Sequence, residues 1–233
     1  MSRPANVIPL ATSTPTLPGA RDRLAVLGRT GSGKTHFACW VLSQANWPSI
    51  PWFVIDYKRD DLLAEIPGAR ELAVTPRRLP RESGIYIVHP RPDEEDEVER
   101  LLWRIWERGR AGLYVDEGHM LPDRGGLQAM LTQGRSKSIP VIVLTQRPSW
   151  VNRFVFSEAD YFSVFHLNDK RDRATIGAFM PAGAVDTPLP ARHSWYYDIA
   201  RNRLYHMLPV PTRAGILARF EARLPRRIAG RFV

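Results

Sequence analysis

The chain of 233 residues is long enough to bury one sizeable core, and its 44% hydrophobic and 24% charged residues exclude an intrinsically disordered protein. Its 33 lysines and arginines outnumber 24 acidic residues, and the net charge of +9 favours a polyanionic partner such as nucleic acid. One cysteine excludes an internal disulfide, and the lack of a long apolar run or signal segment predicts a soluble cytoplasmic protein without a membrane span.

The chain divides into three predicted parts. Residues 1–20 contain four prolines and predict an extended arm. In residues 21–190, short apolar runs alternate with helical periodicity, which predicts an α/β domain with a mostly parallel sheet covered on both faces. Residues 191–233 predict a β-hairpin and a basic tail. The predicted strands are 24–27, 52–55, 85–88, 112–115, 141–144, 161–167, 194–199 and 203–208, and the predicted helices are 35–44, 94–108, 127–133, 169–180 and 212–231.

The stretch GRTGSGKT follows the first predicted strand and opens the first predicted helix. It fits the pattern G-x-x-x-x-G-K-[ST] of a phosphate loop, in which backbone N–H groups and the helix N-terminus face a triphosphate. We expect Lys34 to reach the β and γ oxygens of ATP and the Thr35 hydroxyl to ligate Mg²⁺. The residues expected to bind the nucleotide are Gly28, Arg29, Thr30, Gly31, Ser32, Gly33, Lys34, Thr35 and His36.

An acidic pair, Asp116 and Glu117, ends the predicted strand 112–115. An acid at the end of a core strand beside the phosphate loop can hold Mg²⁺, and the adjacent Glu117 can polarise the attacking water. The alternative is an acidic pair exposed at the surface. Together with the phosphate loop, the pair favours an ATPase over a GTPase or a kinase.

In the stretch GRSKSIPVIVLTQRP, residues 134–148, the predicted core strand 141–144 is followed by the polar residues Thr145, Gln146 and Arg147. Gln146 is expected beside the γ-phosphate, where an amide can sense the phosphate or its water; the alternative is a capping glutamine. Arg135 precedes the strand and is expected near the opposite edge or flank of the sheet. From there it could serve the active site of a neighbouring subunit as a trans-acting finger, for which Arg147 and Arg173 are rival candidates; the alternative for Arg135 is a solvated arginine at the surface.

The segments GRTGSGKT, FVIDYKRDDL, LYVDEGH and GRSKSIPVIVLTQRPS resemble the FtsK/HerA superfamily of ring-forming DNA pumps. The resemblance covers roughly residues 20–180 and departs from the family pattern at Asp56-Tyr57-Lys58, where members commonly have Asp-Pro-Lys. It implies a RecA-like P-loop core, ATP hydrolysis with Mg²⁺, and translocation of double-stranded DNA by a homo-oligomeric ring, a hexamer or a pentamer.

The small size of the chain narrows the resemblance, since cellular members carry further domains or membrane segments. A minimal version is similar to the genome-packaging ATPases of tailless, membrane-containing DNA viruses, which implies work in the host cytoplasm or at a virion vertex, beside capsid or portal proteins. The alternatives are an assembly ATPase of the filamentous-phage Zot type and a non-translocating nucleotide-binding protein of a virion vertex. Arg124 in the loop 118–126 is expected to contact DNA. Contacts with DNA or with an acidic capsid protein are expected from the tail arginines Arg213, Arg219, Arg223, Arg226, Arg227 and Arg231.

Overall fold

The computed structural model describes residues 14–123 and 125–224. Within these residues, one sheet has the strand order β3-β4-β2-β5-β6-β1-β7-β8-β9. In this order, all strands up to and including β7 run parallel to one another. Strands β8 and β9 extend the sheet beyond β7 with antiparallel pairing. Their bounds are β1 Arg23–Leu27, β2 Pro51–Asp56, β3 Arg70–Glu71, β4 Gly84–Val88, β5 Gly112–Asp116, β6 Val141–Thr145, β7 Tyr161–Val164, β8 Ser194–Asp198 and β9 Arg203–Met207.

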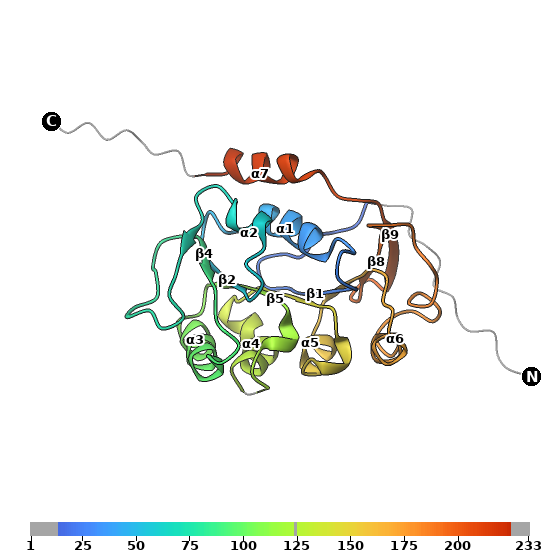
Figure 1. Ribbon diagram of the computed structural model, residues 1–233, viewed down its shortest axis with the longest axis horizontal. Coiled ribbons are helices and arrows are strands. Elements are labelled where there is room, and N and C mark those ends of the chain that lie inside the picture. Colours follow the sequence, from blue (N-terminus) through green and yellow to red (C-terminus); the bar gives the residue numbers. More distant parts are fainter. Residues whose placement is uncertain (1–13, 124, 225–233) are drawn as a thin grey trace, which may run out of the picture.

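Helices cover both faces of this sheet. Figure 1 shows α1, α2 and α7 on one face and α3, α4, α5 and α6 on the other. Two clusters of buried apolar side chains, one on each side of the sheet, form the core. The helices are α1 Lys34–Gln44, α2 Asp61–Ala64, α3 Glu95–Arg108, α4 Gly125–Lys137, α5 Phe154–Ser157, α6 Lys170–Gly177 and α7 Arg213–Ala222, with short 3-10 turns η1 Gly118–Met120 and η2 Pro148–Trp150.

The central strands are buried along their whole length and mostly apolar because both of their faces are covered. The predicted α/β class is therefore confirmed, and β6 lies between β5 and β1. Parallel strands bring their carboxyl ends to one edge of the sheet. That edge collects the phosphate loop after β1, the acidic pair at the end of β5 and Gln146 after β6.

The predicted helix 127–133 is too short at both ends. Helix α4 continues to Lys137, so Arg135 lies on its last turn. The helix stops there because the next residue, Ser138, is left-handed with a φ of +55°, and the Ile139 N–H then donates to the Gly134 carbonyl oxygen over 2.8 Å. A serine in this position gives no sequence signal for a helix end.

Three other predicted elements are shorter in the structure. Strand β7 ends at Val164, helix α6 runs from an Asp169 N-cap to Gly177, and α7 ends at Ala222. The elements α2, β3 and α5 are too short to produce a periodic pattern, and the sequence does not predict them. Predictions for residues 1–13, for Arg124 and for the tail beyond residue 224 lie outside the described residues. In the part of the chain that is described, none of the helices has the length and apolar character needed to cross a bilayer.

Candidate active site

The phosphate loop leaves β1 and turns directly into α1. At Gly28, where φ is +156°, an added Cβ would lie 2.6 Å from the Cβ of Phe165, so the close approach of the two backbones requires glycine. Gly33, with a φ of +103°, precedes the first turn of α1. The Lys34 ammonium donates to the Arg29 carbonyl oxygen over 3.1 Å and so closes the loop on itself. The loop thus presents its backbone at a helix N-terminus, where an anion is favoured.

Lys34 carries a cation that is poorly compensated by its surroundings. The side chain is buried, and burial lowers the pKa of Lys34 to about 8, with a further lowering from the nearby cation of Lys58 and an opposing rise from Asp116. A cation in this state gains more from a bound anion than an exposed lysine does, because it has already lost most of its water.

Thr35 and Asp116 meet across the loop and the end of β5. The Thr35 hydroxyl donates to Oδ2 of Asp116 over 3.5 Å, and Asp116 is fully buried. Burial raises the pKa of Asp116, while the cation of Lys58 opposes that rise. The hydroxyl of Thr35 and the buried carboxylate of Asp116 are hard oxygen ligands of the kind that Mg²⁺ prefers. Among the described residues, no group of three or more His, Cys, Asp or Glu side chains could hold a metal, and Mg²⁺ commonly completes its shell with waters and phosphate oxygens.

Glu117 follows Asp116 in a left-handed conformation, with φ and ψ both near +60°. This sharp turn places its side chain back over the sheet edge, where it is only 3% exposed. One carboxylate oxygen pairs with the Lys58 ammonium, and the other lies 3.1 Å from Nδ1 of His119. Burial lowers the pKa of His119, with a further lowering from Lys58, so the imidazole beside the carboxylate is uncharged at neutral pH.

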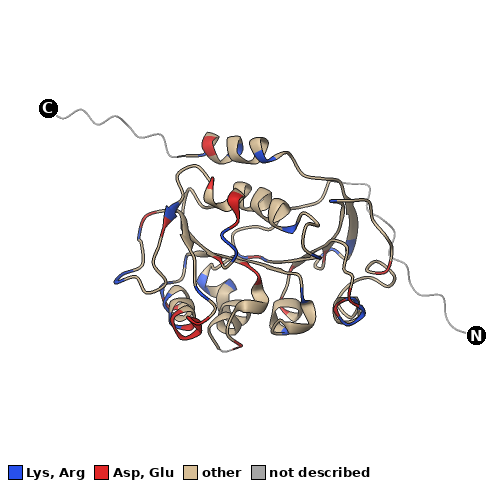
Figure 2. Ribbon diagram, in the orientation of Figure 1, with Lys and Arg blue, Asp and Glu red and all other residues tan. Residues whose placement is uncertain are grey.

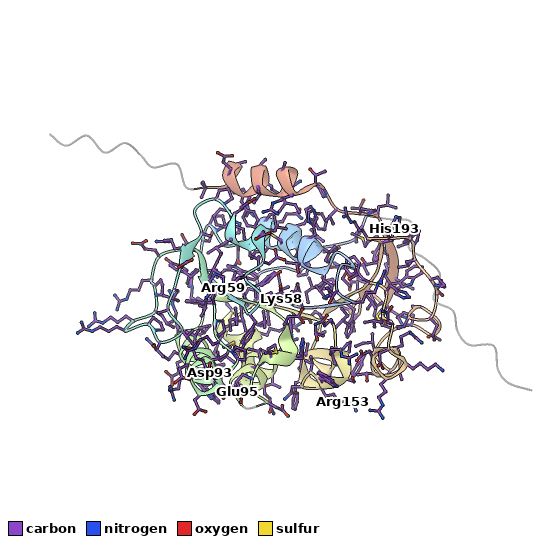
Figure 3. All side chains as sticks on the ribbon, viewed as in Figure 1. Lys58, Arg59, Asp93, Glu95, Arg153 and His193 are labelled. Carbon is purple, nitrogen blue, oxygen red and sulfur yellow. The ribbon has the colours of Figure 1, made fainter. Side chains whose placement is uncertain are left out.

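Lys58 and His119 are residues that sequence reasoning did not assign to the site. Lys58 lies near the middle of the molecule in Figure 3, on the loop between β2 and α2. Asp56 shapes that loop by accepting the N–H groups of Lys58 over 3.1 Å and Asp60 over 2.9 Å. In the sheet, β2 lies next to β5, and Asp56 is in register with Asp116. Lys58, two residues after Asp56, therefore lies at the same edge of the sheet as Asp116 and Glu117.

Gln146 contacts the phosphate loop, because its side-chain oxygen accepts the hydroxyl of Thr30. The Thr145 hydroxyl accepts the N–H of Arg147 over 3.0 Å and fixes the turn after β6. His36 is placed differently. Its Nε2 lies 3.0 Å from the carbonyl oxygen of Pro211, so its ring faces the segment before α7.

The three candidate finger arginines have different surroundings. Arg147 lies 3.7 Å from carboxylate oxygens of Asp169 and Asp172, and Arg173 donates to two backbone carbonyls after β7. Arg135 pairs with Asp160, which directly precedes β7, at the edge of the sheet opposite the phosphate loop. Its side chain is 58% exposed, against 40% for Arg147 and 27% for Arg173. Arg135 is therefore the best exposed of the three to a second molecule.

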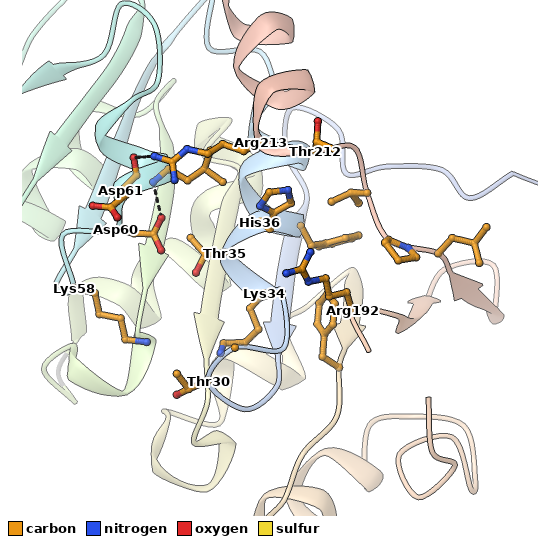
Figure 4. A pocket seen from close by; sticks show the side chains of 18 residues that line it. Thr30, Lys34, Thr35, His36, Lys58, Asp60, Asp61, Arg192, Thr212 and Arg213 are labelled. Atoms are coloured by element: carbon orange, nitrogen blue, oxygen red, sulfur yellow. Dashed lines mark hydrogen bonds between the residues drawn. The ribbon is translucent and has the colours of Figure 1, made fainter. Parts of the chain in front are cut away.

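A cavity of about 600 Å³ opens in front of the phosphate loop. Figure 4 shows Lys58, Asp60 and Asp61 on one side of it and His36, Arg192 and Thr212 on the other, with Thr30, Lys34 and Thr35 between them. Its size is that of a small-molecule site, and its wall near the loop is cationic. The arrangement can hold a polyphosphate at the loop, and Lys58, which lines the cavity, pairs with the buried carboxylate of Glu117.

The DNA packaging ATPase P9 of Enterobacteria phage PRD1 is 47% identical to this chain over 216 residues, an alignment that covers 88% of the chain and 94% of the relative. No family model matches the sequence.

Solved structures share the fold. The genome packaging NTPase B204 of Sulfolobus turreted icosahedral virus 2, in complex with ATP-gammaS, aligns with a TM-score of 0.61 at 18% identity over 82% of this chain and 99% of that one. EssC of Geobacillus thermodenitrificans, ATPases 2 and 3, aligns with a TM-score of 0.62 at 13% identity over 87% of this chain and 44% of that one.

Proposed function

The chain belongs to the family of the DNA packaging ATPase P9 of phage PRD1, and from this premise we propose that it hydrolyses ATP to move double-stranded DNA into a preformed viral capsid. The observation that carries the proposal is the contact of Thr35 with Asp116 beside a buried Glu117, because this set provides both a nucleotide site and a base for hydrolysis. The relationship to P9 favours packaging over the other functions considered for the sequence.

Each residue of the site has a proposed part in hydrolysis. The loop N–H groups and Lys34 bind the β- and γ-phosphates, and Thr35 and Asp116 would hold Mg²⁺, which neutralises phosphate charge when bound. Glu117 accepts the proton of the attacking water, and Gln146 orients that water or senses the γ-phosphate. Lys58, which pairs with Glu117 and lines the cavity, would be a further cation for the terminal phosphate.

Replacement of Lys58 by alanine is expected to change the pH dependence of ATP binding. Binding needs a charged Lys34, so in the wild type the affinity falls by about tenfold per pH unit above the pKa near 8. Lys58 is one cause of that lowered pKa, so Lys58→Ala moves the start of the fall to higher pH. The measurement is the ATP dissociation constant from pH 6 to 10, with the exposed Lys170→Ala as the control. If the ATP affinity of Lys58→Ala starts to fall at the same pH as in the wild type, or at a lower pH, Lys58 does not lower the pKa of Lys34.

The proposed assembly is a ring of six or five subunits with DNA in its central channel. The proposed binding partner of this ring is a capsid vertex or portal protein. Ring formation would bring the exposed Arg135 of one subunit to the phosphates of the next. Basic side chains that could grip DNA phosphates include those in the first turn of α6, at Lys170, Arg171 and Arg173, and Figure 2 shows basic residues on this helix. The proposed place of action is the host cytoplasm and the virion vertex.

A direct test of this function is ATP turnover with and without duplex DNA. The wild type is expected to release phosphate from ATP and to do so several-fold faster with DNA, with the stimulation declining as salt rises because the contacts are to phosphates. Single-stranded DNA of the same length serves as the comparison. If no phosphate is released under either condition, the motor function fails, and a nucleotide-binding structural protein becomes the better account.

A further inference from the structure

Residues 208–212 form a strap that runs from β9 to α7 and passes in front of the N-terminus of α1. The strap is fastened near its end. His36 on α1 lies 3.0 Å from the Pro211 carbonyl oxygen, and Arg213, directly after the strap, donates to Glu65 over 2.8 Å and to the Asp61 carbonyl oxygen over 3.0 Å. Two prolines in the strap restrict its backbone further. The strap is thus a fixed wall of the cavity at the phosphate loop.

The order of the strands in the sheet determines how a triphosphate would be oriented in the cavity. Glu117 and Gln146 follow β5 and β6, which lie on one side of β1, whereas the strap comes from β9 on the other side. A triphosphate held by the loop with its terminal group at Glu117 must therefore extend its remaining part toward the strap. Figure 4 agrees, because Lys58 and Arg192 lie on opposite sides of Lys34.

The strap side of the cavity has the chemistry of a site for a flat apolar group. Leu208, Pro209 and Val210 line it, and Leu208 is a large hydrophobic side chain that is 67% exposed. Arg192 lines the same side, and its Cβ and Cγ lie 3.7 Å from where a Cβ of Gly33 would be. A guanidinium plane beside apolar side chains is a favourable surface for a heterocycle.

We propose that the strap and Arg192 form the nucleoside subsite, in which the base of a nucleoside triphosphate lies between the guanidinium of Arg192 and the apolar side chains of Leu208 and Val210. This inference rests on the proposed nucleotide binding and adds where the nucleoside goes. The phosphate loop alone binds any polyphosphate, so the strap is the part of the site that favours a nucleotide over free polyphosphate. It also links the nucleotide to α7, since the strap continues into that helix.

The test compares the dissociation constants of ATP and of inorganic tripolyphosphate, which lacks the nucleoside, on purified full-length protein. Arg192→Ala and Leu208→Ser are each expected to weaken ATP binding by about tenfold and to change tripolyphosphate binding by less than about twofold. Both side chains are exposed, so the melting temperature is expected to stay that of the wild type. Arg78→Ala, an exposed arginine on the loop between β3 and β4, is the matched control and is expected to change neither constant.

Lys34→Ala separates this inference from the proposed function. It is expected to weaken both ligands, because it removes a phosphate contact. If Lys34→Ala leaves ATP binding intact, nucleotide binding at the loop itself is wrong. If Lys34→Ala acts as expected but Arg192→Ala and Leu208→Ser leave ATP binding unchanged, or weaken both ligands equally, the subsite is wrong while the phosphate site stands.

Discussion

Replacement of Glu117 by glutamine is expected to lower ATP turnover by about a thousandfold while ATP binding persists, since a positioned base contributes about 10²–10⁴ in rate. The amide has the shape of the carboxylate but cannot accept the proton of the attacking water. The phosphate contacts come from Lys34, Thr35 and the loop, so the affinity for ATP should stay within about threefold of the wild-type value. The measurements are steady-state phosphate release and the ATP dissociation constant.

Two controls make this result specific to Glu117. Glu107→Gln, at an exposed position on α3, removes the same charge from the surface and is expected to leave turnover unchanged. Because Glu117 is buried beside Lys58, the melting temperature of the variant shows whether a loss of turnover comes from unfolding. A folded Glu117→Gln protein that hydrolyses ATP at a rate close to that of the wild type contradicts the assignment of the base.

Replacement of Arg135 by alanine is expected to lower turnover by about a thousandfold in a ring of identical subunits, the effect of losing a finger in related phosphate chemistry. The fold should tolerate the change, because Asp160 keeps its bond of 3.0 Å to the Arg23 side chain. Mixing Arg135→Ala with Lys34→Ala subunits should then restore part of the activity. Some interfaces in mixed rings pair an intact phosphate loop with an intact finger.

The mixing experiment distinguishes a finger from a residue that acts within its own subunit. Arg110→Ala is the matched control, because Arg110 is exposed just before β5, at the same edge of the sheet as Arg135. Its turnover should equal that of the wild type, alone and in mixtures. An absence of recovery at every mixing ratio contradicts the finger, and the same experiment on Arg147→Ala and Arg173→Ala then tests the rival arginines.

The parts of the site that sequence predicted are those set by local pattern and by parallel strands. The phosphate loop is a continuous motif, and Asp116 and Gln146 meet it because parallel strands end at one edge of the sheet. The position of Arg135 opposite that edge also follows from the chain direction. These inferences need no knowledge of side-chain packing.

The parts that sequence did not predict depend on how distant segments return to the site. Lys58 reaches Glu117 only because β2 pairs with β5, and a strand order is not written in any single segment. The strap likewise reaches His36 after the chain has left the core, added β8 and β9 to the sheet and turned back across α1. Such contacts follow from tertiary topology, for which periodicity and motifs give no direct signal.

Uptake of DNA into empty capsids tests the central claim most directly. Empty capsids, the purified protein, duplex DNA and ATP are mixed, and the DNA that resists nuclease is measured. The account predicts protected DNA with the wild type and ATP, and none with Glu117→Gln or with a non-hydrolysable ATP analogue. Equal protection with Glu117→Gln, or ATP hydrolysis by the wild type with no protected DNA, would contradict an ATP-driven packaging function.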